Sequence, residues 1–255
     1  MQAGAITGYI DVAQVALYVF WVFFAGLVYY LRREDKREGY PLVTEQPGQR
    51  LQGFPFLPTP KTFLLYSGEE VQVPRPDDQE PEYDAVPAEG FPGAPLLPLG
   101  NPMLAGIGPG ASALRADKPD RMIETNSIKI LPMRVLPLYF VPEESPDPRG
   151  MEVVGADGVV GGIVTDMWID KAEDVVRYLE VTLAAGPSVL LPKPLAKVNM
   201  TARQVVAVSV MGGQFADAPL RANADEVTTR EEDRIQAYFG SGHMYAKPSR
   251  MEPLL

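Results

Sequence analysis

The segment TDMWIDKAEDVVRYLE, residues 165–180, carries the residue types that could do chemistry in this chain. Carboxylates accept and release protons with little rearrangement, and neighbouring negative charges raise one another's pKa toward neutrality. A guanidinium nearby would hold one carboxylate ionised. The pattern is compatible with a proton relay and equally with a solvated acidic face that holds an ordinary ion pair. The segment contains Asp166, Asp170, Glu173, Asp174, Arg177 and Glu180.

Composition argues against most other chemistry. The 255 residues include 10 more acidic than basic side chains, whereas nucleic-acid binding needs a basic face. The chain has no cysteine, which removes disulfides, thiolate metal sites and iron–sulfur clusters. Its single histidine, His243, lies beside glycines, where a loop or helix-end position is more common than a ligand. The sequence therefore predicts no metal site, no catalytic residue and no cofactor bound by this chain alone.

Residues 12–31 form an uncharged apolar run long enough to cross a bilayer. As a helix, twenty residues span about 30 Å, the thickness of the hydrocarbon core. Tyr29 and Tyr30 fall where an interfacial aromatic belt would lie. A cleaved signal peptide would need basic residues before the run, and residues 1–11 contain none. We therefore expect a transmembrane anchor.

A basic cluster follows the apolar run and predicts its orientation. Cytoplasmic ends of membrane helices are enriched in Lys and Arg, so residues 1–11 are expected on the periplasmic side. The same basic side chains are expected to contact lipid headgroups, together with the two tyrosines. The cluster consists of Arg32, Arg33, Lys36 and Arg37.

Residues 32–120 are expected to be a juxtamembrane and extended surface segment. Residues 41–148 hold 20 of the 26 prolines, which rules out long helices and central strands there. Many apolar side chains argue against pure disorder. We expect a chain that lies over another surface and takes its order from a partner, with a short hairpin at 62–73.

Residues 121–255 are expected to form a mainly β domain that positions the acidic segment. Short β-branched and aromatic runs separated by turn residues indicate a small antiparallel barrel. A helix is predicted at 228–239, capped by Thr228 or Thr229 with Glu231 or Glu232, and ended by Gly240 and Gly242. The predicted strands cover 128–141, 159–170, 176–184, 188–192 and 203–211.

Several motifs, in order along the chain, resemble one known family. They are YLRREDKREGYPL at 30–42, TPKTF at 59–63, EGFPGAP at 89–95, VTDMWID at 164–170 and EVTTREED at 226–233. Together they resemble the H subunit of the purple-bacterial photosynthetic reaction centre. The resemblance implies a single N-terminal transmembrane helix and a cytoplasmic PRC-barrel-like β domain, with an extended proline-rich segment and a short C-terminal helix.

The resemblance also implies partners and a role. The chain would cap the L and M subunits in the photosynthetic intracytoplasmic membrane, stabilise the quinone sites and help conduct protons to the secondary quinone. A cytochrome subunit, the light-harvesting antenna and membrane lipids are further expected partners. Bacteriochlorophyll, bacteriopheophytin, quinones and a non-haem iron would lie on the partner subunits. The residues leave an alternative, a single-pass PRC-barrel scaffold or sensor that binds a soluble partner.

The resemblance assigns proton-transfer roles to individual residues: Asp170, Glu173, Arg177, Glu226 and Glu232, with Lys129 as a nearby basic group. Some family members carry a histidine pair before the strand that contains KILPM, at the proton entrance. Here RMIETNSIKILPM, residues 121–133, has no histidine, so if protons enter at this point Glu124 or Asp120 is expected to accept them. Entry at another acidic patch is an equal alternative. We therefore expect weaker or differently placed inhibition by zinc than in a histidine-bearing relative.

Overall fold

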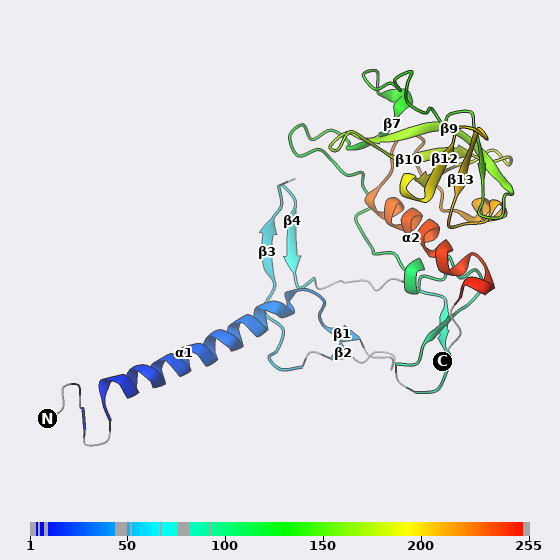
Figure 1. Cartoon of the computed structure of the whole chain (residues 1–255). Coiled ribbons are helices and arrows are strands. Elements are labelled where there is room, and N and C mark those ends of the chain that lie inside the picture. The colour runs from blue at the N-terminus through cyan, green and yellow to red at the C-terminus, as the bar shows by residue number, and fades with distance from the viewer. Residues whose placement is uncertain are drawn as a thin grey trace. The chain divides into compact units, whose positions relative to one another are not determined.

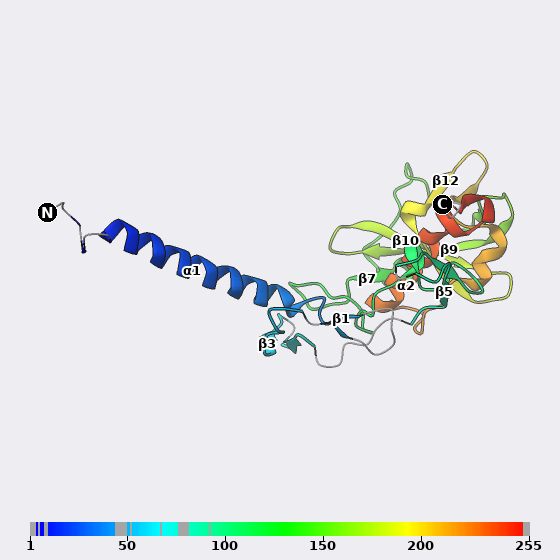
Figure 2. The ribbon, with the colours of Figure 1, turned by 90° about the horizontal axis from the view of Figure 1, so that it is seen from below.

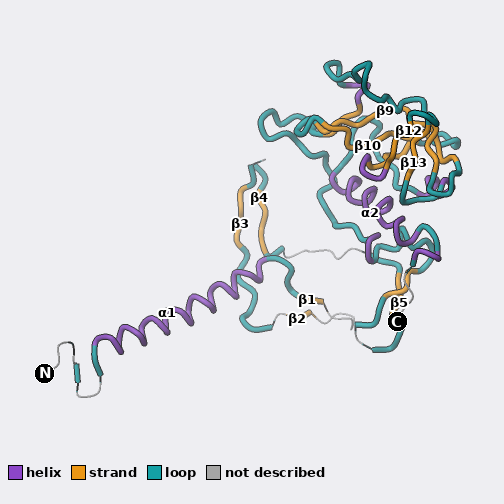
Figure 3. The backbone as a smooth tube through the Cα atoms, in the orientation of Figure 1, coloured by secondary structure: helices purple, strands orange, loops and turns teal. Residues whose placement is uncertain are grey.

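The computed structural model describes residues 4, 6–7, 10–43, 50–51, 53–66, 68–75, 82–91 and 93–251 (Figures 1 and 3). Parts of the predicted periplasmic and proline-rich segments lie outside these ranges. The chain forms two compact units, Met1–Gln79 and Glu80–Leu255. The boundary falls earlier than the predicted one at 120, because Met103, Ala105 and Ile107 are buried and Met103 belongs to the core of the second unit.

The first unit is built on helix α1 (Val12–Glu34), which continues into the 3-10 turn η1 (Asp35–Arg37). Asp11 caps the helix, because its side chain accepts a hydrogen bond from the Gln14 amide at 2.7 Å. Within the span Val12–Arg37, an 18-residue window has a mean hydropathy of 1.9, and none of that window is buried. This helix is long and apolar enough to cross a membrane, as predicted.

Two short antiparallel pairs complete the first unit. The first joins β1 (Leu42–Val43) to β2 (Arg50–Leu51), and the second joins β3 (Lys61–Leu64) to β4 (Glu70–Val73). The second pair is the hairpin predicted at 62–73. Arg37 of η1 donates to the carbonyls of Thr59, just before the hairpin, and of Val73 at its end, and Glu34 of α1 pairs with Lys61 of β3.

The second unit contains a strongly bent sheet of seven strands. Their order is β11-β10-β9-β8-β13-β12, and β7 also pairs with β9. Neighbours are antiparallel except β8 and β13. The strands are β7 (Ile130–Pro132), β8 (Glu152–Val154), β9 (Val160–Asp170), β10 (Val175–Thr182), β11 (Ser188–Pro192), β12 (Ala196–Asn199) and β13 (Gln204–Ala207).

The predicted strands at 159–170, 176–184 and 188–192 are confirmed with small changes at their ends, and the strand at 203–211 is shortened to β13. The run at 128–141 forms only β7, because the 3-10 turn η3 (Met133–Val135) follows at once. Strands β8 and β12 were missed, since each is only three or four residues long. Outside the sheet lie the pair β5 (Ala85–Pro87) and β6 (Leu96–Pro98) and the 3-10 turns η2 (Gly108–Gly110), η4 (Lys193–Leu195), η5 (Gly212–Asp217) and η6 (Pro248–Arg250).

Helix α2 (Thr229–Tyr245) packs against the sheet (Figures 1 and 2). The Thr228 hydroxyl oxygen accepts a hydrogen bond from the Glu231 amide, and the Glu231 carboxylate accepts one from the Thr228 amide, so the predicted capping box is confirmed. The predicted end at Gly240 and Gly242 is wrong, because the helix runs through both. Its apolar face enters the core, which includes Trp168, Tyr178, Leu179, Leu190, Phe215, Ile235, Tyr238 and Phe239.

Candidate functional site

Asp170 lies at the end of β9 and is fully buried. Its Oδ1 accepts a hydrogen bond from the Ala172 amide at 3.0 Å. Its Oδ2 lies 3.6 Å from Lys129 Nζ and, among the described residues, has no hydrogen-bond partner. Burying a carboxylate is costly unless it is paired, so Lys129 is the group that balances Asp170.

Strand pairing brings Lys129 to this position. Ile130 of β7 faces Asp170 of β9 in the sheet, and the Lys171 amide bonds the Lys129 carbonyl at 3.0 Å. On its other side Lys129 lies 3.6 Å from Asp120 Oδ2. Asp120 is held there by the backbone, because the Lys129 amide bonds its carbonyl at 2.9 Å. The exposed fraction of these side chains falls from 50% at Asp120 to 21% at Lys129 and 0% at Asp170.

A second carboxyl group reaches the same region from helix α2. Glu232 Oε2 accepts a hydrogen bond from the Tyr178 hydroxyl at 2.7 Å, and Gln236 Nε2 donates to that hydroxyl at 2.9 Å. Burial raises the pKa of Glu232, and the hydrogen bond from Tyr178 together with the charge of Arg177 only partly offsets this rise. Burial and the neighbouring Glu232 charge also raise the pKa of Tyr178.

Arg177 lies on β10 beside these groups. It is half-buried, and its Nε is a buried donor without a hydrogen-bond partner among the described residues. It lines a hollow of about 270 Å³ together with Tyr178, Pro192, Pro194, Leu195 and Gln236. The charges of Asp120 and Lys129 also act on the Glu232 carboxyl. We refer to Asp120, Lys129, Asp170, Arg177, Tyr178 and Glu232 as the acidic cluster.

The remaining predicted proton-transfer residues lie outside these contacts. Glu173 is exposed in the turn between β9 and β10. Glu124 is exposed in the loop that Arg121 and Ile128 close by a backbone bridge. Glu226 is half-buried, two residues before the cap of α2. The structure thus brings four predicted residues together with Asp120: Lys129, Asp170, Arg177 and Glu232. Glu124 and Glu173 are exposed, and Glu226 is half-buried, away from these contacts.

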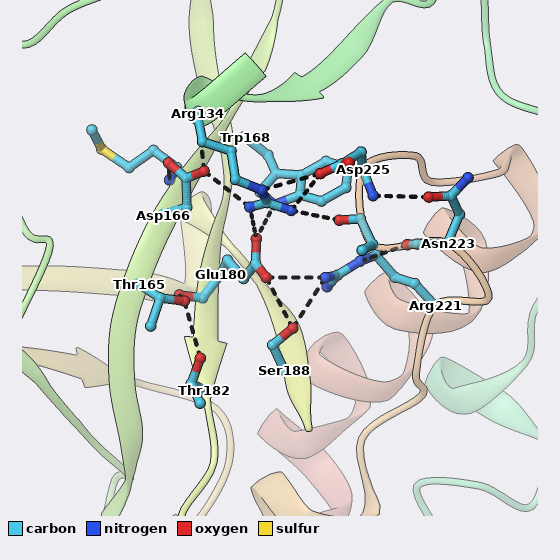
Figure 4. Close-up of polar contacts among 12 residues, drawn as sticks. Arg134, Thr165, Asp166, Trp168, Glu180, Thr182, Ser188, Arg221, Asn223 and Asp225 are labelled. Carbon is cyan, nitrogen blue, oxygen red and sulfur yellow. Dashed lines mark hydrogen bonds and ion pairs between the residues drawn. The ribbon is translucent and has the colours of Figure 1, made fainter. Parts of the chain in front are cut away.

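The two ends of the 165–180 segment belong to a different network, shown in Figure 4. Asp166 and Glu180 face each other across β9 and β10. Arg134 Nη1 donates to Glu180 Oε2 at 2.7 Å and to Asp166 Oδ2 at 3.0 Å. Arg221 Nη2 donates to Glu180 Oε1 at 3.1 Å, and Trp168 Nε1 donates to Oε2 at 2.8 Å.

This network holds Glu180 ionised. Burial would raise the pKa of Glu180, but the hydrogen bonds from Arg134 and Trp168 and the charge of Arg221 hold it below its ordinary value. Arg221 also lies over the Trp168 ring, 4.8 Å from its centroid. Sequence reasoning missed these arginines because each lies more than forty positions from Glu180. No local spacing pattern connects them.

The predicted membrane-interface residues divide into two groups. Tyr29, Tyr30 and Arg32 are exposed and Arg33 is half-buried. In contrast, Lys36 is buried, and its Nζ donates to the Pro55 carbonyl at 2.7 Å.

Arg37 is also engaged within the chain. It forms two hydrogen bonds with the Glu34 carboxylate, at 2.8 and 2.9 Å, and donates to the carbonyls of Thr59 and Val73. The cationic groups of Lys36 and Arg37 therefore face their own chain, where they hold the juxtamembrane loops. For Tyr29, Tyr30, Arg32 and Arg33, contact with lipid headgroups stays a prediction.

Comparison with known families covers both units of the chain. Residues 4–135 match the family model described as the photosynthetic reaction centre, H-chain N-terminal region. That match covers more than half of the chain. The chain belongs to the reaction-centre H-chain family. Residues 143–216 match the PRC-barrel domain, which contains strands β8–β13. The chain is thus a membrane-anchored accessory subunit that associates with reaction-centre subunits.

The acidic cluster draws on both matched regions and on the helix beyond them. Asp120 and Lys129 lie in the H-chain match, Asp170 and Arg177 lie in the PRC-barrel match, and Glu232 follows it on α2. Strand β7 joins the two matched regions by pairing with β9. Among the described residues, no three His, Asp or Glu side chains are grouped so as to hold a metal ion.

Proposed function

We propose that this chain caps the L and M subunits of a reaction centre, stabilises the quinone sites and conducts protons toward the secondary quinone through the acidic cluster. The observation that carries the proposal is the graded burial of Asp120, Lys129 and Asp170, which are joined by ion-pair distances of 3.6 Å. A relay needs groups that lead from solvent into a shielded interior, and this order of exposure supplies them.

The chemistry of the inner groups supports the same role. A carboxyl group transfers protons best when its pKa lies near the working pH, and burial moves the pKa of Glu232 in that direction. Lys129 balances the negative charge of the Asp170 carboxylate. Oδ2 of Asp170 has no hydrogen-bond partner among the described residues and so remains open to a proton donor. Asp120 is the exposed member of the cluster, and we propose it as the proton entrance in preference to Glu124.

The proposal includes an orientation and a set of partners. The exposed Arg32 and the neighbouring Arg33 lie in the last turn of helix α1, whereas the described part of the chain before the helix has Asp11 as its only charged side chain. By the positive-inside rule, the β domain is then cytoplasmic and the N-terminus periplasmic. Bacteriochlorophyll, bacteriopheophytin, quinones and the non-haem iron are assigned to the partner subunits.

The test uses the complete reaction centre with Asp170→Asn, Glu232→Gln and the double variant. We expect slower flash-induced proton uptake and slower second electron transfer to the quinone, with the first electron transfer unchanged. Glu152→Gln, an exposed carboxylate on β8, is the matched control. Wild-type proton uptake in the double variant would contradict the relay. If bacteriochlorophyll absorbance does not co-purify with the chain from detergent-solubilised membranes, the capping role is contradicted.

A further inference from the structure

Helix α2 carries two neighbouring acidic residues, and only one of them belongs to the acidic cluster. Glu232 binds the Tyr178 hydroxyl, whereas Asp233 lies about 100° farther around the helix. Asp233 accepts a hydrogen bond from the Ala113 amide at 2.5 Å, and its carboxylate lies 3.5 Å from the Arg115 guanidinium. Asp233 therefore holds a segment that precedes it by 120 positions.

Residues 113–119, here called the strap, form neither helix nor strand and lie along the first turns of α2. The Thr229 amide donates to the Lys118 carbonyl at 3.1 Å, and the Thr229 hydroxyl donates to the Ala116 carbonyl at 2.6 Å. An amide in the first turn of a helix has no partner within the helix, so the strap satisfies a donor that α2 leaves open.

Arg230 and Thr228 bind the strap at further points. Arg230 Nε donates to the Arg115 carbonyl at 3.0 Å, and its Nη1 lies 3.5 Å from Asp117 Oδ2. The Thr228 hydroxyl donates to Asp117 Oδ1 at 2.9 Å. These two side chains of Arg230 and Asp117 are 35% and 58% exposed, whereas Asp233 is 28% exposed. Because solvent screens the more exposed ion pair, the Asp233 contacts are the stronger charged hold on the strap.

The strap leads into the exposed member of the acidic cluster. Pro119 forms a backbone bridge with Thr228, and Asp120 follows directly. The Lys129 amide binds the Asp120 carbonyl at 2.9 Å, so the contact between Asp120 and Lys129 does not need the strap. The charge of Asp120 also acts on the Glu232 carboxyl of α2, so these two groups lie near each other. The strap thus sets the separation between Asp120 and helix α2.

We propose that Asp233 is a positioning residue for proton transfer, because it holds the strap on α2 and so keeps Asp120 beside Glu232. This inference rests on the proposed relay through the acidic cluster. The Asp233 carboxylate is engaged by the Ala113 amide and the Arg115 guanidinium, so it acts through the strap and is not itself a proton carrier.

Amide hydrogen exchange of the full chain in detergent, followed by NMR, measures the strap directly. Asp233→Ala should raise the exchange rate of the Thr229 amide about tenfold, the effect of losing one charge-assisted hydrogen bond. Alanine favours helix, so weakened helix propensity cannot cause this loss. Asp233→Asn keeps an oxygen acceptor for the Ala113 amide and should recover most of the protection. Arg234→Ala, an exposed neighbour on α2, is the control and should change nothing. Equal exchange in the wild type and Asp233→Ala would overturn the proposal.

Flash-induced proton uptake by the complete reaction centre tests the functional part. Asp233→Ala should slow uptake by no more than Asp120→Asn does, and it should add nothing in an Asp120→Asn background, because Asp233 acts through Asp120. Asp233→Asn should restore uptake, whereas a proton carrier would be lost in both Asp233 variants.

Two outcomes would overturn the positioning role for different reasons. If Asp233→Ala slows uptake by the same factor with and without Asp120→Asn, Asp233 does not act through Asp120. If Asp120→Asn alone leaves uptake unchanged while Asp233→Ala speeds amide exchange, the strap contact stands, and it is the proposed proton entrance at Asp120 that fails.

Discussion

A single change at Glu180 should strongly destabilise the β domain. Its carboxylate accepts hydrogen bonds from Arg134, Trp168, Ser188 and Arg221, at 2.7 to 3.1 Å. Glu180→Gln keeps the shape but removes the negative charge, and it turns an NH₂ group toward one of the arginines. The guanidinium groups of Arg134 and Arg221 then share a site that has lost one negative charge.

The size of the destabilisation depends on the ion pairs that each arginine retains after the substitution. Arg134 is 39% exposed and retains Asp166 and Asp225, so its loss is small. Arg221 is only 4% exposed, and Glu180 is its one ion pair among the described residues. Breaking a buried pair by removing one partner costs roughly 3–5 kcal/mol. We expect the lower end, about 3 kcal/mol, because Arg134 is screened by solvent.

Urea unfolding of the full chain in detergent measures this cost. A Trp21→Phe background leaves the buried Trp168 as the only tryptophan, so its fluorescence reports on the β domain. With a typical urea dependence of about 1–3 kcal/mol per molar, the midpoint should fall by about 1–3 M. The control is Asp147→Asn, which breaks the exposed pair with Arg149 and should cost less than about 1 kcal/mol.

A second variant separates charge from packing. Adding Arg221→Met to Glu180→Gln removes the uncompensated cation, so the double variant should be more stable than Glu180→Gln alone. The reasoning is refuted if Glu180→Gln costs no more than Asp147→Asn. It is equally refuted if Arg221→Met lowers the free energy of unfolding by the same amount in the wild type and in Glu180→Gln, because the two side chains would then be energetically independent.

Three further predictions concern helix α2. Gly242→Ala should destabilise the β domain by roughly 1–3 kcal/mol in the urea-unfolding experiment, since its Cβ would lie 2.8 Å from the Ser209 carbonyl oxygen, whereas Gly240→Ala meets no atom within 4 Å and should be neutral or stabilising. Thr228→Ala should cost about 1 kcal/mol in a urea titration through loss of the cap, and a wild-type midpoint would disprove the capping argument. Burial raises the folded-state pKa of Glu232 above its ordinary value, so its contribution to stability is full below the unfolded-state pKa and is lost as pH rises through the folded-state pKa; Glu232→Gln should flatten that part of the stability–pH profile, and an unchanged slope would contradict the raised pKa.

Local patterns in the sequence were sufficient for much of the fold. The uncharged run at 12–31 predicted α1, because a bilayer-length apolar helix needs no tertiary contact to be recognised. Strands β9, β10 and β11 and the capping box of α2 were predicted for the same reason, since alternation and cap chemistry are local. The H-chain family was also evident from motifs spread along the chain.

The end of α2 shows where local rules failed. Glycine usually ends a helix because it weakens helical backbone, yet the helix continues through Gly242. There the missing side chain lets the helix approach the Ser209 backbone, where a Cβ would collide. Packing against the segment that follows β13 therefore decided a feature that the local pattern had assigned to the end of the helix.

Long-range pairing also decided which carboxylates belong together. Sequence alone determined that this chain has a membrane-length helix, a proline-rich connection, a β domain and an acidic segment. Only the tertiary structure decided that Asp170 pairs with Lys129, that Glu180 is held ionised by Arg134 and Arg221, and that Lys36 turns inward to Pro55. The physical reason is that charge interactions depend on distance and burial, and residues far apart along the chain acquire both only when the sheet and loops have closed.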